Sequence, residues 1–182
     1  MPRYNFDPTH SAADFSARHM MITTVRGGFK NVNGYVEYDP ANPANSYVEA
    51  TIDTNQITST GLQQRDDHLK SAEFLDIENF PTITFKSTKV EPYGNGNNAK
   101  ITGDLTIHGV TKSVVVDAEL LGENKSPWGT TNIGFTGSTK INREDFGLTW
   151  NMALETGGWL VGKDITINLD VEAVLVTEAA AV

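Results

Sequence analysis

The stretch RDDHLKSAEFLDIENFPTITF, residues 65–85, interrupts a long run of strand-like sequence and then restarts it. Its first part has the composition of a helix, and its second part enters a strand through Pro81. Thr60 lies three positions before Gln63, which is the spacing of a capping box that begins a helix. We therefore expect this stretch to plug or brace a structure made of sheet.

The expected helix has one narrow apolar face. Leu62 and Leu69 are seven positions apart with Arg65 between them, so the three side chains share one side of the helix. This spacing predicts a short helix lying over a hydrophobic opening.

The segments around this helix alternate between apolar and polar residues, which is typical of antiparallel strands wetted on one face. In residues 47–54, for example, Val48, Ala50 and Ile52 alternate with polar side chains. Four further segments follow the same period of two, with their apolar positions at Ile101, Leu105, Ile107; Val114, Val116, Ala118, Leu120; Ile133, Phe135, Ile141; and Ile165, Ile167, Leu169, Val171, Ala173.

Turn-forming residues separate these segments at residues 39–43, 93–98, 108–109 and 125–129. His108 and Gly109 stand between two closely matched segments, which predicts a tight hairpin. About eight strands result, a number that can close into a barrel holding side chains or one ligand. The predicted fold is therefore all-β, an extended eight-stranded antiparallel barrel with a short helix covering one mouth.

The chain of 182 residues is predicted to form one domain over residues 1–176, followed by a frayed tail at 177–182. Its 38% hydrophobic and 20% charged residues are compatible with a soluble globular protein. The net charge of −9 argues against binding to nucleic acid and against electrostatic docking to an anionic membrane. No apolar run has the length of a membrane span, so we expect no stable membrane insertion.

The beginning of the chain, MPRYNFDPTH, carries no apolar segment typical of a signal peptide. We therefore expect a cytoplasmic protein, or a periplasmic one if the chain is already processed. The absence of cysteine excludes disulfides and thiolate chemistry.

The residues that could carry chemistry favour structural roles. His10, His19, His68 and His108 show none of the short spacings typical of a metal site, so no metal is predicted. The stretch Arg143-Glu144-Asp145-Phe146-Gly147 follows a strand, where we expect an Arg–carboxylate pair to lock a barrel corner and the glycine to allow an unusual backbone angle. No nucleophile elbow, phosphate loop or dinucleotide motif is present, so no catalytic residue and no cofactor is predicted.

Large apolar residues point instead to an interior with spare room. The set includes Phe15, Phe74, Phe85, Phe135, Trp150 and Trp159, and each of them singly would fill a core. The segment 151–163 does not alternate, and we expect it to be a mobile apolar loop or half-helix near one mouth. The apolar residues, the long strands and this segment together favour a barrel too large for its own side chains to fill.

Several motifs, in order, resemble the YceI-like family over residues 4–175. They are Asp7-Pro8-Thr9-His10-Ser11 with Phe15 and His19, Gly27-Gly28-Phe29, residues 65–71 with Phe74-Leu75-Asp76 and Phe80-Pro81, residues 103–111, Ile141-Asn142-Arg143 with Asp145-Phe146-Gly147, and Val161-Gly162. The resemblance implies a lipocalin-like barrel that holds a long polyisoprenoid, such as an isoprenoid quinone or polyprenyl lipid, for its metabolism, transport or storage. It also makes a homodimer plausible.

Two functions follow as hypotheses. The first is a binding protein whose ligand is the lipid, held in an apolar tube. The residues expected to line it are Phe15, Met20, Ile52, Phe74, Phe85, Leu105, Ile107, Val116, Phe135, Leu154, Trp159 and Ile167. The alternative is an enzyme acting on an isoprenoid or small amphiphile, with His68 or His19 as base near Asp66 or Arg143. A filled barrel with no ligand, serving as a scaffold, is a third possibility.

Overall fold

The alternating segments form ten β-strands in a computed structural model that describes residues 1–177. The expected frayed tail therefore lies, apart from Thr177, outside the described residues. The strands are β1 (Arg3–Phe6), β2 (Ala12–His19), β3 (Thr23–Lys30), β4 (Asn33–Glu37), β5 (Tyr47–Asp53), β6 (Thr82–Tyr93), β7 (Asn98–Ile107), β8 (Val110–Lys125), β9 (Thr131–Asn142) and β10 (Val161–Leu175).

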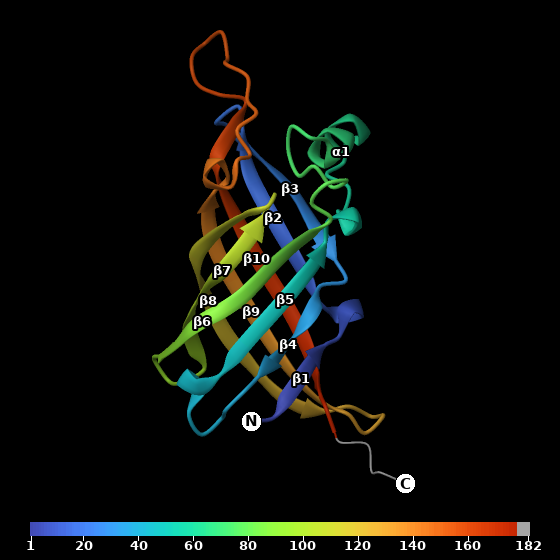
Figure 1. Cartoon of the computed structure of the whole chain (residues 1–182), viewed down its shortest axis with the longest axis vertical. Coiled ribbons are helices and arrows are strands. Elements are labelled where there is room, and N and C mark those ends of the chain that lie inside the picture. The colour runs from blue at the N-terminus through green and yellow to red at the C-terminus, as the bar shows by residue number, and fades with distance from the viewer. Residues whose placement is uncertain (178–182) are drawn as a thin grey trace.

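The ten strands occupy eight positions around a closed antiparallel barrel. The order β4-β5-β6-β7-β8-β9-β10 is closed by β1, which pairs with both β4 and β10. Above β1, strand β2 pairs with the other half of β10, and β3 pairs with β2. One barrel position is therefore shared by β1 and β2, and another by β3 and β4. The prediction of an eight-stranded barrel is confirmed (Figure 1).

The hairpin predicted at His108 and Gly109 joins β7 to β8. Both residues have positive φ angles, 52° and 72°, as a two-residue turn matching the twist of the strands requires. The ring of Phe80 packs against His108 with centroids 4.6 Å apart, so this turn lies near the start of β6.

A connection spanning residues 54–81 joins β5 to β6 and carries the short 3-10 helix η3 (Thr54–Gln56) and the α-helix α1 (Gln63–Lys70). The connection is tied to β3 by the Thr58 backbone N–H, which donates to the Gly28 carbonyl at 2.7 Å. Figure 1 shows α1 beside the upper end of β3, opposite the end that holds both termini.

The predicted capping box is wrong. The helix begins after Leu62, which makes no side-chain cap, and the Thr60 hydroxyl instead donates to Asp66 Oδ1. Gly61 and Leu62 separate Thr60 from the first helical turn, and the Thr60 hydroxyl oxygen accepts from Arg65 Nε instead of from a backbone N–H of the helix.

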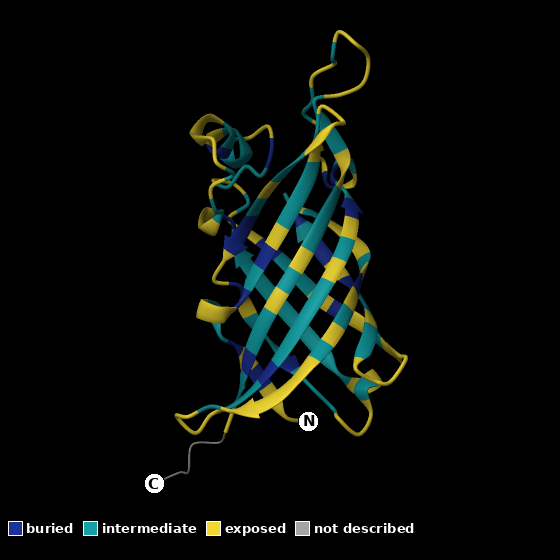
Figure 2. Ribbon diagram, turned by 180° about the vertical axis from the view of Figure 1, so that it is seen from behind, coloured by how far each residue is buried: buried dark blue, intermediate teal, exposed yellow. Residues whose placement is uncertain are grey.

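The wall of the barrel is wet outside and apolar inside. Figure 2 shows exposed residues alternating with intermediate or buried ones along the strands, as the period-two pattern predicts. No helix within residues 1–177 is both long enough and apolar enough to cross a membrane.

Candidate ligand-binding cavity

The inward side chains surround a cavity of about 620 Å³. It extends from Phe6 and Val36 near the terminal end of the barrel to Leu62 and Trp150 at the helix end. A volume of this size is typical of a small-molecule or lipid site. The predicted hollow interior is therefore present.

Small residues on the inner face explain why the barrel is hollow. Inward positions are occupied by Ala13, Ala17, Ala50, Ala118 and Gly137. Two phenylalanine rings lie close against glycines of the neighbouring strand, Phe15 against Gly27 and Phe85 against Gly103. Because these rings pack along the wall, the centre stays free.

The terminal end of the barrel is closed by a buried apolar cluster. Tyr4 and Phe6 of β1 pack there with Val36, Ile133 and Ala173, and the last two are at most 1% exposed. The Tyr4 hydroxyl donates to Glu123 Oε2 at 2.7 Å, and burial together with this contact raises the pKa of Tyr4 to about 12. The phenol therefore remains a neutral donor at physiological pH.

The helix end of the cavity is the mouth, and residues of α1 form part of its rim. Leu62, Arg65 and Leu69 all line the cavity, so the predicted narrow face of the helix does point inward. His68 lies on the rim as well, with its ring 4.4 Å from that of Trp150. Phe74 contacts both rings, at 4.9 Å and 5.5 Å between centroids. An aromatic group therefore joins the helix segment to the chain after β9.

Asp66 holds the helix segment in place. Its carboxylate accepts hydrogen bonds from the Ser59 hydroxyl at 2.6 Å and from the Thr60 hydroxyl and backbone N–H at 2.5 and 2.9 Å. These bonds lower the pKa of Asp66 to about 2. Arg65 donates to the hydroxyl and carbonyl of the same Thr60. Asp66 is therefore an ionised structural group that closes the loop before α1.

Arg143 is buried in the wall near the mouth, but it does not form the predicted Arg–carboxylate pair. Its guanidinium donates to the backbone carbonyls of Gly162, Leu148 and Trp150. Gly147, at φ 78°, has the unusual angle expected, and the chain that follows it supplies the Leu148 and Trp150 carbonyls. The pairing prediction is wrong because carbonyls of the segment after the turn and of β10 surround the guanidinium, and Glu144 pairs with Lys163 instead.

Eight of the twelve residues expected to line the tube do border the cavity. They are Phe15, Ile52, Phe74, Phe85, Leu105, Val116, Phe135 and Ile167. That these side chains contact a ligand stays a prediction.

The other four lie elsewhere. Ile107, the last residue of β7, packs in a buried cluster with Phe146 and does not border the cavity. Met20 is 42% exposed in the turn between β2 and β3. Leu154 and Trp159 belong to the loop between β9 and β10, which folds as a turn held by the Ala153–Trp159 bridge and projects past the mouth (Figure 1). No half-helix forms in that segment.

Several lining residues were missed although the alternation contains them. Ile165, Leu169 and Val171 share the inner face with Ile167, and Val114 shares it with Val116. The rim residues Arg18, Gln64 and His68 left no pattern in the sequence, because the rim is assembled from separate segments.

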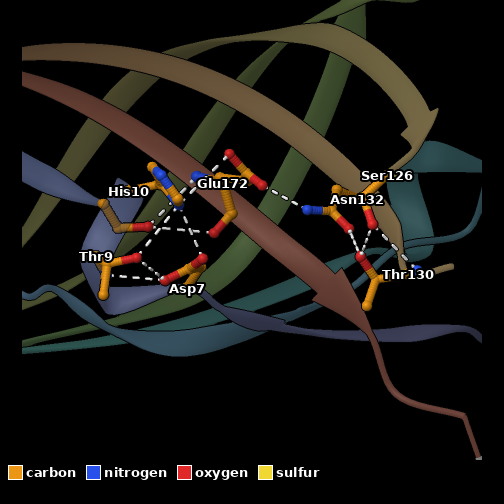
Figure 3. A network of polar contacts seen from close by, with 8 residues as sticks. Asp7, Thr9, His10, Ser126, Thr130, Asn132 and Glu172 are labelled. Carbon is orange, nitrogen blue, oxygen red and sulfur yellow. Dashed lines mark hydrogen bonds and ion pairs between the residues drawn. The ribbon is translucent and has the colours of Figure 1, made fainter. Parts of the chain in front are cut away.

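A polar network lies away from the cavity, where the start of the chain crosses β10 (Figure 3). His10 Nδ1 is 2.9 Å from Asp7 Oδ2 and 3.9 Å from Glu172 Oε2, and Asn132 donates to Glu172 Oε1. Hydrogen bonds from Thr9 and His10 lower the pKa of Asp7 to about 2, and Asp7 raises the pKa of His10.

Asp7, His10 and Glu172 are the ligand-type groups that converge within residues 1–177, with all ligand atoms within 4.8 Å of one another. The spacing rules applied to the histidines did not reveal this set, because Glu172 comes from the far end of the sequence. The side chain of His10 is 64% exposed, and the contacts of the set are those of a surface ion pair.

The fold and the cavity define the chain as a lipocalin-like antiparallel barrel with an apolar interior. Its sequence matches the YceI-like domain over residues 4–173, and the chain belongs to that family. Among its relatives are UPF0312 proteins of Vibrio cholerae and Pseudomonas fluorescens, which are 40% and 42% identical to it. These matches each cover 76% of this chain, and 72% and 71% of the relative.

Solved structures agree on the fold. The YCEI protein of Campylobacter jejuni is 35% identical, with a TM-score of 0.72 over 86% of this chain and 88% of that one. BcnA of Burkholderia cenocepacia is 24% identical and superimposes with a TM-score of 0.79, covering 92% and 99%. A domain of Saccharophagus degradans described as polyisoprenoid-binding is 14% identical, with a TM-score of 0.69 and coverage of 95% and 98%.

Proposed function

We propose that this protein binds a long-chain polyisoprenoid, an isoprenoid quinone or a polyprenyl lipid, inside the barrel and serves in its metabolism, transport or storage. The observation that carries the proposal is the apolar cavity, closed at the terminal end and open at the helix end. The Saccharophagus domain of the same fold, described as polyisoprenoid-binding, supports the choice of ligand class.

The driving force is removal of the hydrocarbon from water. Each buried methylene contributes about 0.8 kcal/mol, so a long tail has ample affinity without an ion pair. Ordering a flexible chain offsets much of that gain. Binding therefore depends on the shape and dryness of the tube.

The polar head of the ligand would stay at the rim, where Gln64, Arg65 and His68 stand. Arg65 already donates to Thr60, and His68 Nε2 lies 2.6 Å from Glu73 Oε2. Because Arg65 and His68 are occupied within the protein, we expect weak discrimination between head groups.

The test is organic extraction of freshly purified protein followed by mass spectrometry. We expect a polyisoprenoid in the extract, and less of it from Phe135→Asp, which places a charge on the cavity wall. Ser138→Asp, at an exposed position of the same strand, is the matched control and should retain the lipid. A parent protein that yields no lipid and takes up none when offered would overturn the proposal.

A further inference from the structure

Two loops that project beyond the mouth carry a group of exposed apolar side chains, which we call the apical patch. Its members are Met20, Met21 and Ile22 in the β2–β3 turn and Met152 and Trp159 in the β9–β10 loop. Each is between 42% and 78% exposed. Scattered exposed apolar residues are normal on a protein surface, but five on adjacent loops at one tip form a patch that indicates an interaction surface.

The two loops are fixed to each other, so the patch has a defined shape. The Met20 N–H donates to the Leu160 carbonyl at 2.8 Å, and the Leu160 N–H donates to the Met152 carbonyl at 2.9 Å. A Cβ placed on Gly158 would stand 3.7 Å from Met21 Cγ. Figure 2 shows the β9–β10 loop as an exposed extension of the barrel.

The local backbone holds the methionines outward at a conformational cost. Met20 and Met21 have φ angles of 51° and 64°, and the Ile22 N–H donates to the His19 carbonyl across them. Turns of this kind favour Asn and Gly at their central positions. Large apolar residues at positions that suit small polar ones are a local inconsistency of the sort found at functional sites.

The β2–β3 side of the patch is basic, although the β9–β10 loop carries the exposed Glu155. No Asp or Glu occurs between Phe15 and Val36, whereas Arg18 and Arg26 flank the turn in a chain with a net charge of −9. Within residues 1–177 neither arginine takes part in an ion pair. Arg26 is four residues from Ile22, roughly 13 Å along a strand. The overall charge therefore does not describe the β2–β3 side of the patch, where the two arginines outnumber the single acidic residue of the neighbouring segment 151–160.

We propose that the apical patch docks on an anionic phospholipid bilayer. The methionines, Ile22 and Trp159 would lie at the level of the headgroups, and Arg18 and Arg26 would face the lipid phosphates. Apolar and aromatic side chains next to cations are the combination that binds such an interface. The patch borders the cavity mouth, because Leu160 and His19, which are linked to it, line the cavity. Given the proposed function, a lipid can then pass between bilayer and cavity without crossing water.

The test is flotation of the full chain with vesicles of phosphatidylcholine alone and of phosphatidylcholine mixed with phosphatidylglycerol. We expect the parent protein to float with the mixed vesicles and to bind less as salt is raised. Met21→Glu combined with Ile22→Glu should weaken vesicle binding by about tenfold or more. Arg26→Gln should lower binding to the mixed vesicles only.

Trp128→Ala is the matched control, because Trp128 is 87% exposed in the β8–β9 turn at the opposite end of the barrel. This variant should float like the parent. The double variant should still yield as much lipid on extraction, since neither residue lines the cavity. The vesicle assay therefore reads the docking surface separately from ligand binding.

The proposal is overturned if the parent does not float, if the double variant floats as well as the parent, or if phosphatidylglycerol makes no difference. A dimer of the parent that the double variant abolishes, seen by light scattering without vesicle binding, would assign the patch to a second copy of the chain.

Discussion

The ring of Phe85 on β6 occupies the space beside Gly103 on β7 in which a Cβ would stand. A Cβ on Gly103 would collide with that ring and would lie 2.6 Å from the Lys86 carbonyl oxygen. The phenylalanine can lie along the wall only because its neighbour has no side chain. This pair shows how the barrel combines large apolar residues with an open centre.

Replacing Gly103 by valine should therefore push the Phe85 ring inward and strain the β6–β7 pairing. We expect a loss of about 1–3 kcal/mol in the free energy of unfolding and less extractable lipid. Gly134→Ala is the control, since its Cβ would meet only Leu121 at an ordinary 3.7 Å. Thermal melting and lipid extraction check both effects, and a Gly103→Val protein with parental stability would contradict the account.

Filling the cavity should reduce binding without unfolding the protein. Ala118 faces the cavity from β8, and Ala118→Phe adds a ring to the space that a ligand would use. We expect the amount of bound lipid to fall while the melting temperature stays at or above that of the parent. Glu119→Phe places the same ring on the outer face and should leave lipid content unchanged.

Removing the Arg143 side chain should be among the most destabilising changes. The carbonyls of Gly162, Leu148 and Trp150 would lose their donor, at a cost of about 3 kcal/mol or roughly 6 to 12 °C in melting temperature. Arg143→Lys should recover only part of it, because an ammonium lacks the planar fork. Arg26→Gln on the surface should melt with the parent.

Acid should loosen the helix segment before it unfolds the barrel. The pKa of Asp66 is lowered from 3.8 to about 2, so its contribution is complete above pH 4 and is lost as the pH falls toward 2. Asp66→Asn should lower the melting temperature at neutral pH and flatten the stability profile in that acid range. The pKa of Asp7 is also lowered to about 2, so the loss of its contacts with Thr9 and His10 should lower the stability over the same acid range. Melting curves of Asp66→Asn and Asp7→Asn between pH 2 and 7 would separate the contributions of the two carboxylates.

The strands could be predicted because the apolar residues that face the interior recur at every second position of each strand. The His108–Gly109 turn, the barrel and the inward position of Phe135 all follow from that period. The same rule shows why Ile107 was misplaced, since alternation gives the face of a strand but not the distance of a residue from its end. At the end of β7 the cluster around Phe146 takes up that side chain.

The mouth could be predicted only in part, because it is built from contacts between distant segments. The face shared by Leu62 and Leu69 indicated the helix, but the meeting of His68 with Trp150 depends on how two loops cross. The prediction that Thr60 caps the helix failed for a local reason, because its hydroxyl donates to Asp66 and accepts from Arg65. The β9–β10 loop has no periodicity to read, because residues 151–160 form neither a helix nor a regular strand.

Closure of the sheet also bears on how the protein behaves when it is abundant. A strand with a free border offers unpaired backbone groups to another chain and invites aggregation. Here β1 pairs with both β4 and β10 and so closes the sheet. The unpaired side of β3 carries the charged Arg26 and two glycines, and the Thr58 N–H already occupies the Gly28 carbonyl. Crowded copies therefore find little template for adding strands to one another, and the molecule can accumulate without polymerising through its wall.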